Sequence, residues 1–279
     1  MRASALEAAG VTAAFSTRLG GVSQGAYASL NLSRGTGDRP EAVEENRRRW
    51  LAALGEGWRP AWLSQVHGAR VVEAGREEAT VPEADAHWTG ERGLLLGVLA
   101  ADCVPVLVAM PSPAGWLVGA AHAGWRGTAA RVAAALVEAM RGAGGRPELG
   151  RAAIGPSIGP CCYEVGEEVQ EALARAYPGA PLRLRAPGRD HVDLWEANRR
   201  ALVEAGLPEE GVDVAGLCTR CHPQLFYSYR GQGRTGHMAA SVGILPGGPA
   251  PGRAALPGAR AAGAERQVER ASGSIQYAG

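Results

Sequence analysis

The chain has 279 residues, of which 46% are hydrophobic and 20% are charged, and its formal net charge at pH 7 is +1. A chain of this length can bury a substantial core, and acids interspersed with arginines exclude the basic footprint of a protein that binds nucleic acid or anionic membranes. The 29 basic residues are all arginine, which excludes Schiff-base enzymes, pyridoxal enzymes and Walker-type phosphate loops, because each needs a lysine amine.

Helices are predicted at four places. Asp38 and Pro40 supply a cap and an early proline for a helix over 42–54. A second helix starts near Thr128 and ends in the glycines at 142–145, a third spans about 165–177, and a fourth opens at Asp193 with a capping-box spacing and stops around Gly206. Short, partly β-branched runs predict strands over 11–16, 94–99, 104–110, 116–121, 152–154, 212–217, 226–229 and 238–245.

The order of these elements favours an α+β fold. Adjacent strands without a helix between them, as from 94 to 121, favour antiparallel pairing over a repeated βαβ array. We expect one catalytic domain over 1–246. From Gly247 the sequence is rich in Pro, Gly and Ala without an apolar period, so 247–279 is predicted to be a flexible tail, in which only 265–271 has the composition of a short helix.

The N-terminal ten residues lack the apolar core of a signal peptide, and the longest apolar run, 94–110, is interrupted by Asp102. We therefore expect a cytoplasmic protein. In a reducing compartment its five cysteines are expected to be thiols or metal ligands rather than disulfides.

Three short segments each offer one metal ligand: His67 within 64–68, Cys103 within 101–103, and His122 within 121–127. Two imidazoles and one thiolate suit Zn²⁺, and three protein ligands leave a coordination position for water or substrate, which is typical of a catalytic site. The spacing matches no compact zinc finger. Cys103 could therefore also be an ordinary buried thiol that precedes an apolar strand.

Longer segments surround these ligands, at 15–23, 29–32, 155–165 and 218–221. Together and in this order, the segments resemble the YfiH-type laccase-domain family over about residues 12 to 245. The resemblance implies four layers, with helices outside two packed, largely antiparallel sheets. It also implies a zinc-dependent purine nucleoside phosphorylase that converts adenosine, inosine and methylthioadenosine to free base and ribose 1-phosphate, with accompanying adenosine deaminase activity. The family's older name, polyphenol oxidase, points instead to copper, which such a site can bind in vitro.

A phosphate site is predicted at the turn after His122. The turn over 124–127 should present backbone N–H groups beside Arg126, and together these can hold a phosphate without lysine. The alternative is that Arg126 only pairs with a carboxylate. In phosphorolysis the phosphate attacks C1′, whereas in deamination a hydroxide attacks C6 of adenosine.

Departure of a purine needs a proton donor, and the candidates in order of preference are Glu164, Asp85 and Asp102. Glu164 is expected to open a helix, where a carboxylate is favoured in any case. Asp85 lies between turn-like segments. If Asp102 is in an extended segment, its side chain would point away from that of Cys103 and would support the ligand or cap the backbone instead.

Arg18, Asn31 and Tyr163 lie in segments that match the family, and are expected either to line the nucleoside pocket or to brace loops through hydrogen bonds. The remaining histidines, His87, His191 and His237, are expected to be structural.

Cysteines 218 and 221, followed by His222, spell a haem attachment motif, which normally requires an exported chain. Buried structural cysteines are expected here, while a paired-thiol or second metal role together with Cys161 stays open.

Two other functions stay open beside the phosphorylase. One is a metal-free cysteine hydrolase or deamidase with Cys103 as nucleophile and His122 as its base. The other is a copper-dependent polyphenol oxidase, although six scattered histidines cannot supply the His-x-His clusters of multicopper oxidases. The expected partners are a purine nucleoside and phosphate, with no nucleic acid and no membrane, on a monomer or weak homo-oligomer.

Overall fold

The computed structural model describes residues 1–6, 10–75, 81–186 and 189–247. Nearly all of the tail predicted over 247–279, including the stretch at 265–271, lies outside the described residues. Within the described part of the chain, every helix is too short or too polar to span a bilayer.

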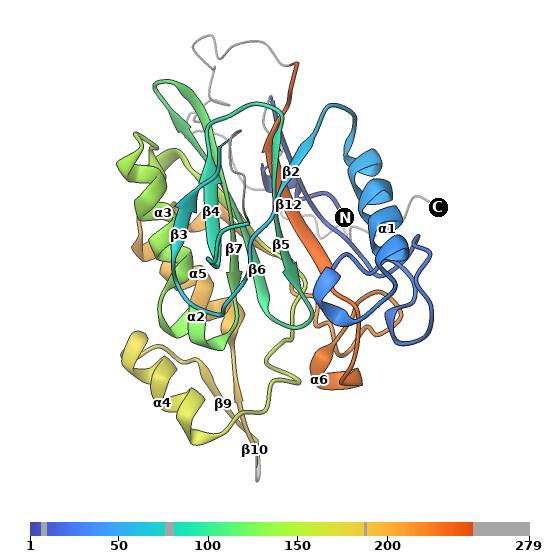
Figure 1. The fold of residues 1–279 in the computed structure, drawn as a ribbon. Coiled ribbons are helices and arrows are strands. Elements are labelled where there is room, and N and C mark those ends of the chain that lie inside the picture. The colour runs from blue at the N-terminus through green and yellow to red at the C-terminus, as the bar shows by residue number, and fades with distance from the viewer. Residues whose placement is uncertain (7–9, 76–80, 187–188, 248–279) are drawn as a thin grey trace, which may run out of the picture.

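The described strands are β1 (Val11–Phe15), β2 (Arg59–Ala61), β3 (Val71–Glu73), β4 (Ala86–Thr89), β5 (Leu94–Ala100), β6 (Val104–Ser112), β7 (Gly115–Ala123), β8 (Arg151–Ile154), β9 (Arg183–Ala186), β10 (Arg189–Val192), β11 (Val212–Val214) and β12 (Met238–Ile244). The described helices are α1 (Pro40–Leu54), α2 (Trp125–Ala129), α3 (Val132–Gly142), α4 (Glu167–Ala176), α5 (Leu194–Glu204) and α6 (Tyr229–Gln232). Figure 1 shows their arrangement.

Two mixed sheets form the centre of the molecule (Figure 1). One has the strand order β11-β8-β6-β7-β4-β3 and the other has the order β1-β12-β5-β2. Antiparallel pairs lie in the middle of each sheet, while the parallel pairs β11–β8, β3–β4 and β2–β5 lie at the edges. Strands β9 and β10 form a separate antiparallel hairpin.

The apolar run of β6 is buried on both of its faces. Val104, Val106 and Val108 pack in the cluster that contains α3 and α5, while Leu107 and Ala109 pack in the cluster between the two sheets. Because side chains alternate along a strand, an uninterrupted apolar run is what a strand between two cores requires.

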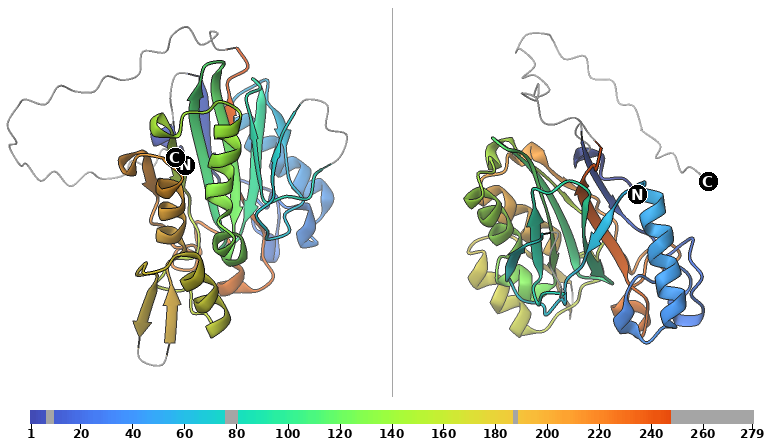
Figure 2. Two further views of the ribbon diagram at one scale, coloured as in Figure 1. Left: turned by 90° about the vertical axis from the view of Figure 1, so that its left-hand side faces the viewer. Right: turned by 45° about the horizontal axis from the view of Figure 1, so that its top comes forward.

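Helices cover the outer faces of both sheets (Figure 2). Helices α3 and α5 pack on the six-stranded sheet, and α1 packs on the four-stranded sheet through Trp50 and Leu54. The indole of Trp50 also donates a hydrogen bond of 3.1 Å to the hydroxyl of Ser241 on β12. The fold is therefore α+β with four layers in the order helix, sheet, sheet, helix, as the resemblance implied.

Strands β5 and β6 do not pair with each other, although the uninterrupted strand region from 94 to 121 favours such pairing. Only β6 and β7 form the expected antiparallel hairpin, whereas β5 belongs to the other sheet. The short segment 101–103 therefore carries the chain from one sheet to the other. Cys103 consequently lies where the two sheets meet.

Several boundaries differ from the sequence-based predictions. The strand predicted over 226–229 is wrong, because Phe226 and Tyr227 are buried in a small apolar cluster with Ala101 and Met238 and are followed by α6. The helix predicted near Thr128 is two helices, separated at Arg131, whose φ of 59° is left-handed. Glu164 does not open a helix, because α4 begins three residues later at Glu167.

Five short strands, β2, β3, β4, β9 and β10, were not predicted from the sequence. Each has only three or four residues, and several carry proline, histidine or charge in place of an alternating apolar pattern. The N-terminus predicted for the fourth helix is confirmed, because the Asp193 side chain accepts a hydrogen bond from the backbone N–H of Glu196.

Candidate functional site

The side chains of His67, Cys103 and His122 converge, and their ligand atoms all lie within 4.8 Å of one another. The pairing of β6 with β7 explains part of this arrangement, because it sets Val104 opposite Ala123 and Pro105 opposite His122. Cys103, which precedes β6, is thereby placed beside the end of β7.

His67 comes from the loop between β2 and β3 and has a φ of 61°. The side chain of Gln65 holds this loop to β5, since its amide nitrogen donates to the carbonyl of Leu99 and its amide oxygen accepts from the N–H of Leu99, both at 2.8 Å. The third ligand is therefore positioned by the four-stranded sheet, and the site bridges both sheets.

Asp85 positions two of the three ligands. Its carboxylate accepts hydrogen bonds from the backbone N–H groups of Val66, His67 and Gly68 at 3.3, 2.9 and 2.6 Å, and it lies 2.9 Å from Nδ1 of His122. Burial alone would raise the pKa of this carboxyl, but the hydrogen bonds from His122 and the backbone hold the pKa below its ordinary value. An ionised Asp85 keeps the Nδ1 proton on His122 and leaves Nε2 available to a metal.

Gly124 allows the ligands to approach one another. A Cβ at this position would lie 3.0 Å from Sγ of Cys103 and 3.2 Å from Cδ2 of His67. The imidazole rings of His67 and His122 meet edge to face, with 4.9 Å between their centroids. Any residue larger than glycine at 124 would therefore press on two of the ligands.

The pKa values of Cys103 and His122 depend on their neighbours in the site. Burial would raise the pKa of Cys103, but the neighbouring imidazoles of His122 and His67 lower it to about 6. Burial would lower the pKa of His122, but the Cys103 thiolate and Asp85 raise it to about 9. Cys103 is thus a thiolate near neutral pH, the form that binds a metal or acts as a nucleophile.

Asp102 fixes the segment that carries Cys103. This residue has a φ of 95°, a conformation that L-residues rarely adopt. Its carboxylate accepts a hydrogen bond of 2.6 Å from the hydroxyl of Thr219 and another of 2.6 Å from the backbone N–H of Arg230. The sheet crossover is thereby tied to the loop that leads into α6.

A cavity of about 830 Å³ opens beside the three ligands and includes all of them in its lining. Four aromatic side chains and three arginines also line it: Trp62, Trp125, Tyr163, Tyr229, Arg34, Arg47 and Arg230. Aromatic faces suit a planar base, and guanidinium groups suit a phosphate. The cavity can therefore accept a ligand that combines an aromatic ring with an anionic partner.

Comparison with known proteins places this chain in a family. Residues 12–245 match the family model described as multi-copper polyphenol oxidoreductase laccase. The chain belongs to this laccase-domain family. Its solved members include YfiH of Bacillus licheniformis, described as a hypothetical protein, which is 34% identical, has a TM-score of 0.77 and is matched over 86% of this chain and 98% of its own.

Curated members of the laccase-domain family carry a functional name. Purine nucleoside phosphorylase YlmD of Geobacillus stearothermophilus is 40% identical over 263 residues, covering 87% of this chain and 93% of the relative. Purine nucleoside phosphorylase YfiH of Escherichia coli is 39% identical, covering 85% of this chain and 95% of the relative. The crystal structure of YlmD from G. stearothermophilus superposes with a TM-score of 0.77 and covers 85% of this chain and 93% of that one.

Two residues expected in the site of this laccase-domain chain lie outside the cavity. The guanidinium of Arg126 is stacked 4.1 Å from the centroid of the Trp125 ring and lies 3.9 Å from the carboxylate of Glu168. Glu164 is exposed and borders two surface hollows, one along α4 and one that shares Trp125, Tyr163 and Arg230 with the cavity. The structure therefore does not bring Arg126 or Glu164 to the three ligands.

Arg18 and Asn31 brace loops. Arg18 donates to the carbonyls of Ala28 and Pro223, both at 2.8 Å. The fully buried Asn31 accepts from the backbone N–H of His237 at 3.0 Å and donates to Asp38. Of the three residues expected to line the pocket or brace loops, only Tyr163 lines the cavity.

Arg230 and His237 were not predicted for the site from the sequence, yet both line the cavity. Among the described residues, Nδ1 of His237 has no hydrogen-bond partner, and burial, followed by the charges of His122 and His67, lowers its pKa to about 4. The register of β12 with β5 sets Met238 opposite Ala100. That long-range pairing, which places His237 near Cys103, is the signal that the sequence lacks.

Proposed function

We propose that this chain is a purine nucleoside phosphorylase that uses Zn²⁺ held by His67, Cys103 and His122. The observation that carries the proposal is the convergence of these three ligands within 4.8 Å, at the edge of a cavity lined by aromatic rings and arginines. The names of the curated relatives support the same reaction class.

The donor set fits the metal. Two imidazole nitrogens and one thiolate are ligands that zinc prefers, and a three-ligand set leaves a coordination position open. Asp85 supplies the carboxylate that commonly stands behind a ligating histidine. When bound, Zn²⁺ supplies a Lewis acid that polarises an oxygen of the substrates. The same donors also suit copper, so metal analysis of the purified protein decides between the two.

Arg230 is the arginine best placed to hold phosphate. Its backbone N–H is tied to Asp102, next to Cys103, and its guanidinium lies 5.2 Å from the ring of Tyr163. Arg126, the phosphate ligand that the sequence favoured, does not line the cavity. Phosphate held beside Arg230 would be oriented toward C1′ of a nucleoside in the same cavity.

Tyr163 and His237 are proposed to contact the purine. Burial, followed by the charge on Cys103, raises the pKa of Tyr163 to about 12, so its hydroxyl stays protonated and can donate a hydrogen bond. This position favours Tyr163 over the exposed Glu164 as the group that assists departure of the base. Adenosine, inosine and methylthioadenosine are the proposed substrates, and deamination of adenosine is the proposed side reaction in this cavity.

A chromatographic assay tests the reaction class. Adenosine is incubated with the metal-loaded protein, with and without phosphate, and we expect adenine and ribose 1-phosphate only when phosphate is present. Inosine formed in either case would measure the deaminase activity. Turnover that is independent of phosphate and yields no free base would contradict the phosphorylase.

Matched arginine variants test the phosphate site. We expect Arg230→Gln to raise the KM for phosphate about tenfold or more, the loss expected for a charge-assisted hydrogen bond. Arg126→Gln is the control and should leave this KM unchanged. A larger rise in the KM for phosphate in Arg126→Gln than in Arg230→Gln would instead place the phosphate site at the turn after His122.

We propose a metal-free cysteine hydrolase as the second candidate function, on the basis of the lowered pKa of Cys103 and its contact with His122. The Cys103 thiol, with a pKa of about 6, lies beside His122, and Asp85 holds the His122 ring. These three residues can act as nucleophile, base and orienting carboxylate, as in a catalytic triad. Such an enzyme keeps its activity after chelation and loses it to iodoacetamide. The phosphorylase is expected to lose activity on chelation and to regain it with added zinc.

A further inference from the structure

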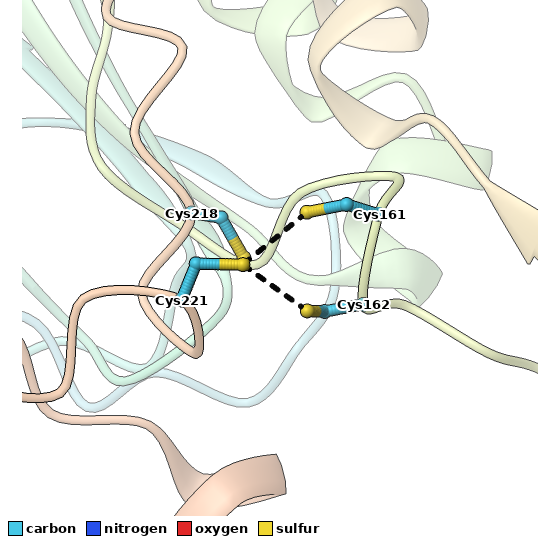
Figure 3. Close-up of side chains that lie close together, drawn as sticks. All are labelled: Cys161, Cys162, Cys218 and Cys221. Atoms are coloured by element: carbon cyan, nitrogen blue, oxygen red, sulfur yellow. Dashed lines mark hydrogen bonds between the residues drawn. The ribbon is translucent and has the colours of Figure 1, made fainter.

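A second group of metal-ligating side chains lies apart from the three cavity ligands. Cys161, Cys162, Cys218 and Cys221 point toward one another from two loops (Figure 3). Their sulfur atoms all lie within 4.8 Å of one another, and Sγ of Cys221 lies 3.6 Å from that of Cys161 and 3.4 Å from that of Cys162. The proposed phosphorylase reaction does not use these four residues.

We propose that these four cysteines bind one Zn²⁺ in a closed, structural site. Four thiolates at about 2.3 Å from a shared Zn²⁺ lie about 3.8 Å from one another, close to the separations seen here. Cys218 and Cys221 have the Cys-x-x-Cys spacing with which one loop chelates zinc. Four protein donors complete a tetrahedron, so this site holds no position for substrate.

The sulfur–sulfur distances favour a single metal ion over an iron–sulfur cluster or a disulfide, the two other structures that four neighbouring cysteines can form. An iron–sulfur cluster spreads its four thiolates over more than one metal and holds them farther apart than one ion does. A disulfide needs two sulfurs at about 2.05 Å, whereas all five cysteines of the chain are free and Sγ of Cys221 stays well beyond bonding distance of Cys161 and Cys162.

Hydrogen bonds support the backbone around the four cysteines. Sγ of Cys218 accepts a hydrogen bond of 3.3 Å from the backbone N–H of Gly159. The two loops are also joined by backbone hydrogen bonds, from Ser157 to the carbonyl of Leu217 and from Thr219 to the carbonyl of Ser157. Such backbone support holds thiolates in place and is typical of structural metal sites.

Both loops continue into the wall of the cavity. Tyr163 directly follows Cys161 and Cys162, and Thr219, between Cys218 and Cys221, donates its hydroxyl hydrogen bond to Asp102. Zinc bound by the four cysteines thus clamps the segments that position Tyr163 and the residue before Cys103. This inference does not depend on the proposed function, because it concerns a separate ligand set.

Cobalt binding to the Cys103→Ser protein tests the proposal. This variant removes the thiolate of the cavity site, so any thiolate-to-cobalt charge-transfer absorption must come from the four remaining cysteines. After reduction, we expect one equivalent of Co²⁺ to give the intense spectrum of a tetrahedral four-thiolate site, and one equivalent of Zn²⁺ to displace it. Absence of this absorption would overturn the proposal.

Two further measurements guard against a misfolded variant. In the folded wild-type protein, Zn²⁺ should protect the four thiols from a thiol reagent, and fewer than five reactive thiols in the denatured, unreduced protein would reveal a disulfide instead. In the Cys103→Ser background, replacing Cys161 and Cys221 by serine should abolish the cobalt spectrum, while His222→Ala, the control, should retain it. The opposite pattern would show that the ligand set is wrong.

Discussion

Asp85 shows how one carboxylate joins candidate metal ligands from distant parts of the chain. It receives three backbone N–H groups from 66–68 and the imidazole of His122, and its side chain is fully buried. Without these partners, burial of the charge would be costly, so the four interactions and the burial depend on one another. The loop of His67 and the end of β7 are therefore held in one arrangement.

Replacing Asp85 by asparagine should weaken metal binding. The amide has one oxygen instead of two acceptors and cannot hold the Nδ1 proton of His122 as a carboxylate does. We expect the dissociation constant for Zn²⁺ to rise about 10- to 100-fold, as measured by competition with a chromophoric chelator. Asp213→Asn, at an exposed position on β11, is the control. Equal zinc affinity in both variants would show that Asp85 does not position the ligands.

At the residue scale, the sequence could indicate three candidate metal ligands but not which residues surround them. His67, Cys103 and His122 lie in short segments in which the residue type alone identifies a candidate ligand. Arg230 and His237 reach the cavity through contacts with residues more than a hundred positions away, such as the bond from Arg230 to Asp102. A single sequence does not contain such pairings, so it favoured Arg126 and Glu164, which do not line the cavity, over Arg230 and His237, which do.

The crossover between β5 and β6 is the element that creates the site. Its three residues carry the chain between sheets, and the buried Asp102 holds the turn. The apolar strands on either side were predictable from composition, because a strand buried on both faces needs no alternation. The short edge strands could not be predicted in this way. Their pairing, such as that of β3 with β4, depends on the neighbouring strands rather than on their own sequence.

The contact between α3 and the six-stranded sheet requires glycine at 119 on β7. A Cβ there would lie 2.9 Å from Cδ1 of Leu136 and 2.9 Å from Sδ of Met140. We expect Gly119→Ala to lower the free energy of unfolding by about 1–3 kcal/mol, the usual cost of overpacking a core.

Urea denaturation measures this loss of stability, and a glycine-to-alanine substitution on α3, the helix that packs on Gly119, is the control. A Cβ at Gly142, in the last turn of α3, would meet no atom within 4 Å, so Gly142→Ala should leave the midpoint unchanged or raise stability by up to about 1 kcal/mol. If both variants unfold at the wild-type midpoint, the helix can move away from the sheet without cost.

At the scale of the whole molecule, the two sheets enclose an ionisable group. His87 on β4 is 1% exposed, and its imidazole forms a hydrogen bond with the backbone of Gly97 on β5, in the opposite sheet. Among the described residues, its Nε2 has no hydrogen-bond partner. Burial lowers the pKa of His87 from 6.5 to about 3, so the ring is neutral in the folded protein near pH 7.

This burial predicts a loss of stability in acid. Above pH 6.5, His87 is neutral in both states and adds no pH dependence. Between pH 6.5 and 3, the unfolded chain binds a proton that the folded chain does not. The free energy of unfolding should therefore fall by about 1.4 kcal/mol for each unit by which the pH decreases in this window.

His87→Gln should remove this contribution, because glutamine can keep a hydrogen bond to Gly97 but does not titrate. Urea unfolding from pH 7 to pH 4 measures the slope for the wild type and the variant. His237, whose pKa is also lowered, contributes with the same sign in both proteins and cancels in the difference. Parallel stability curves for the wild type and His87→Gln would mean that the space between the sheets admits a protonated histidine without penalty.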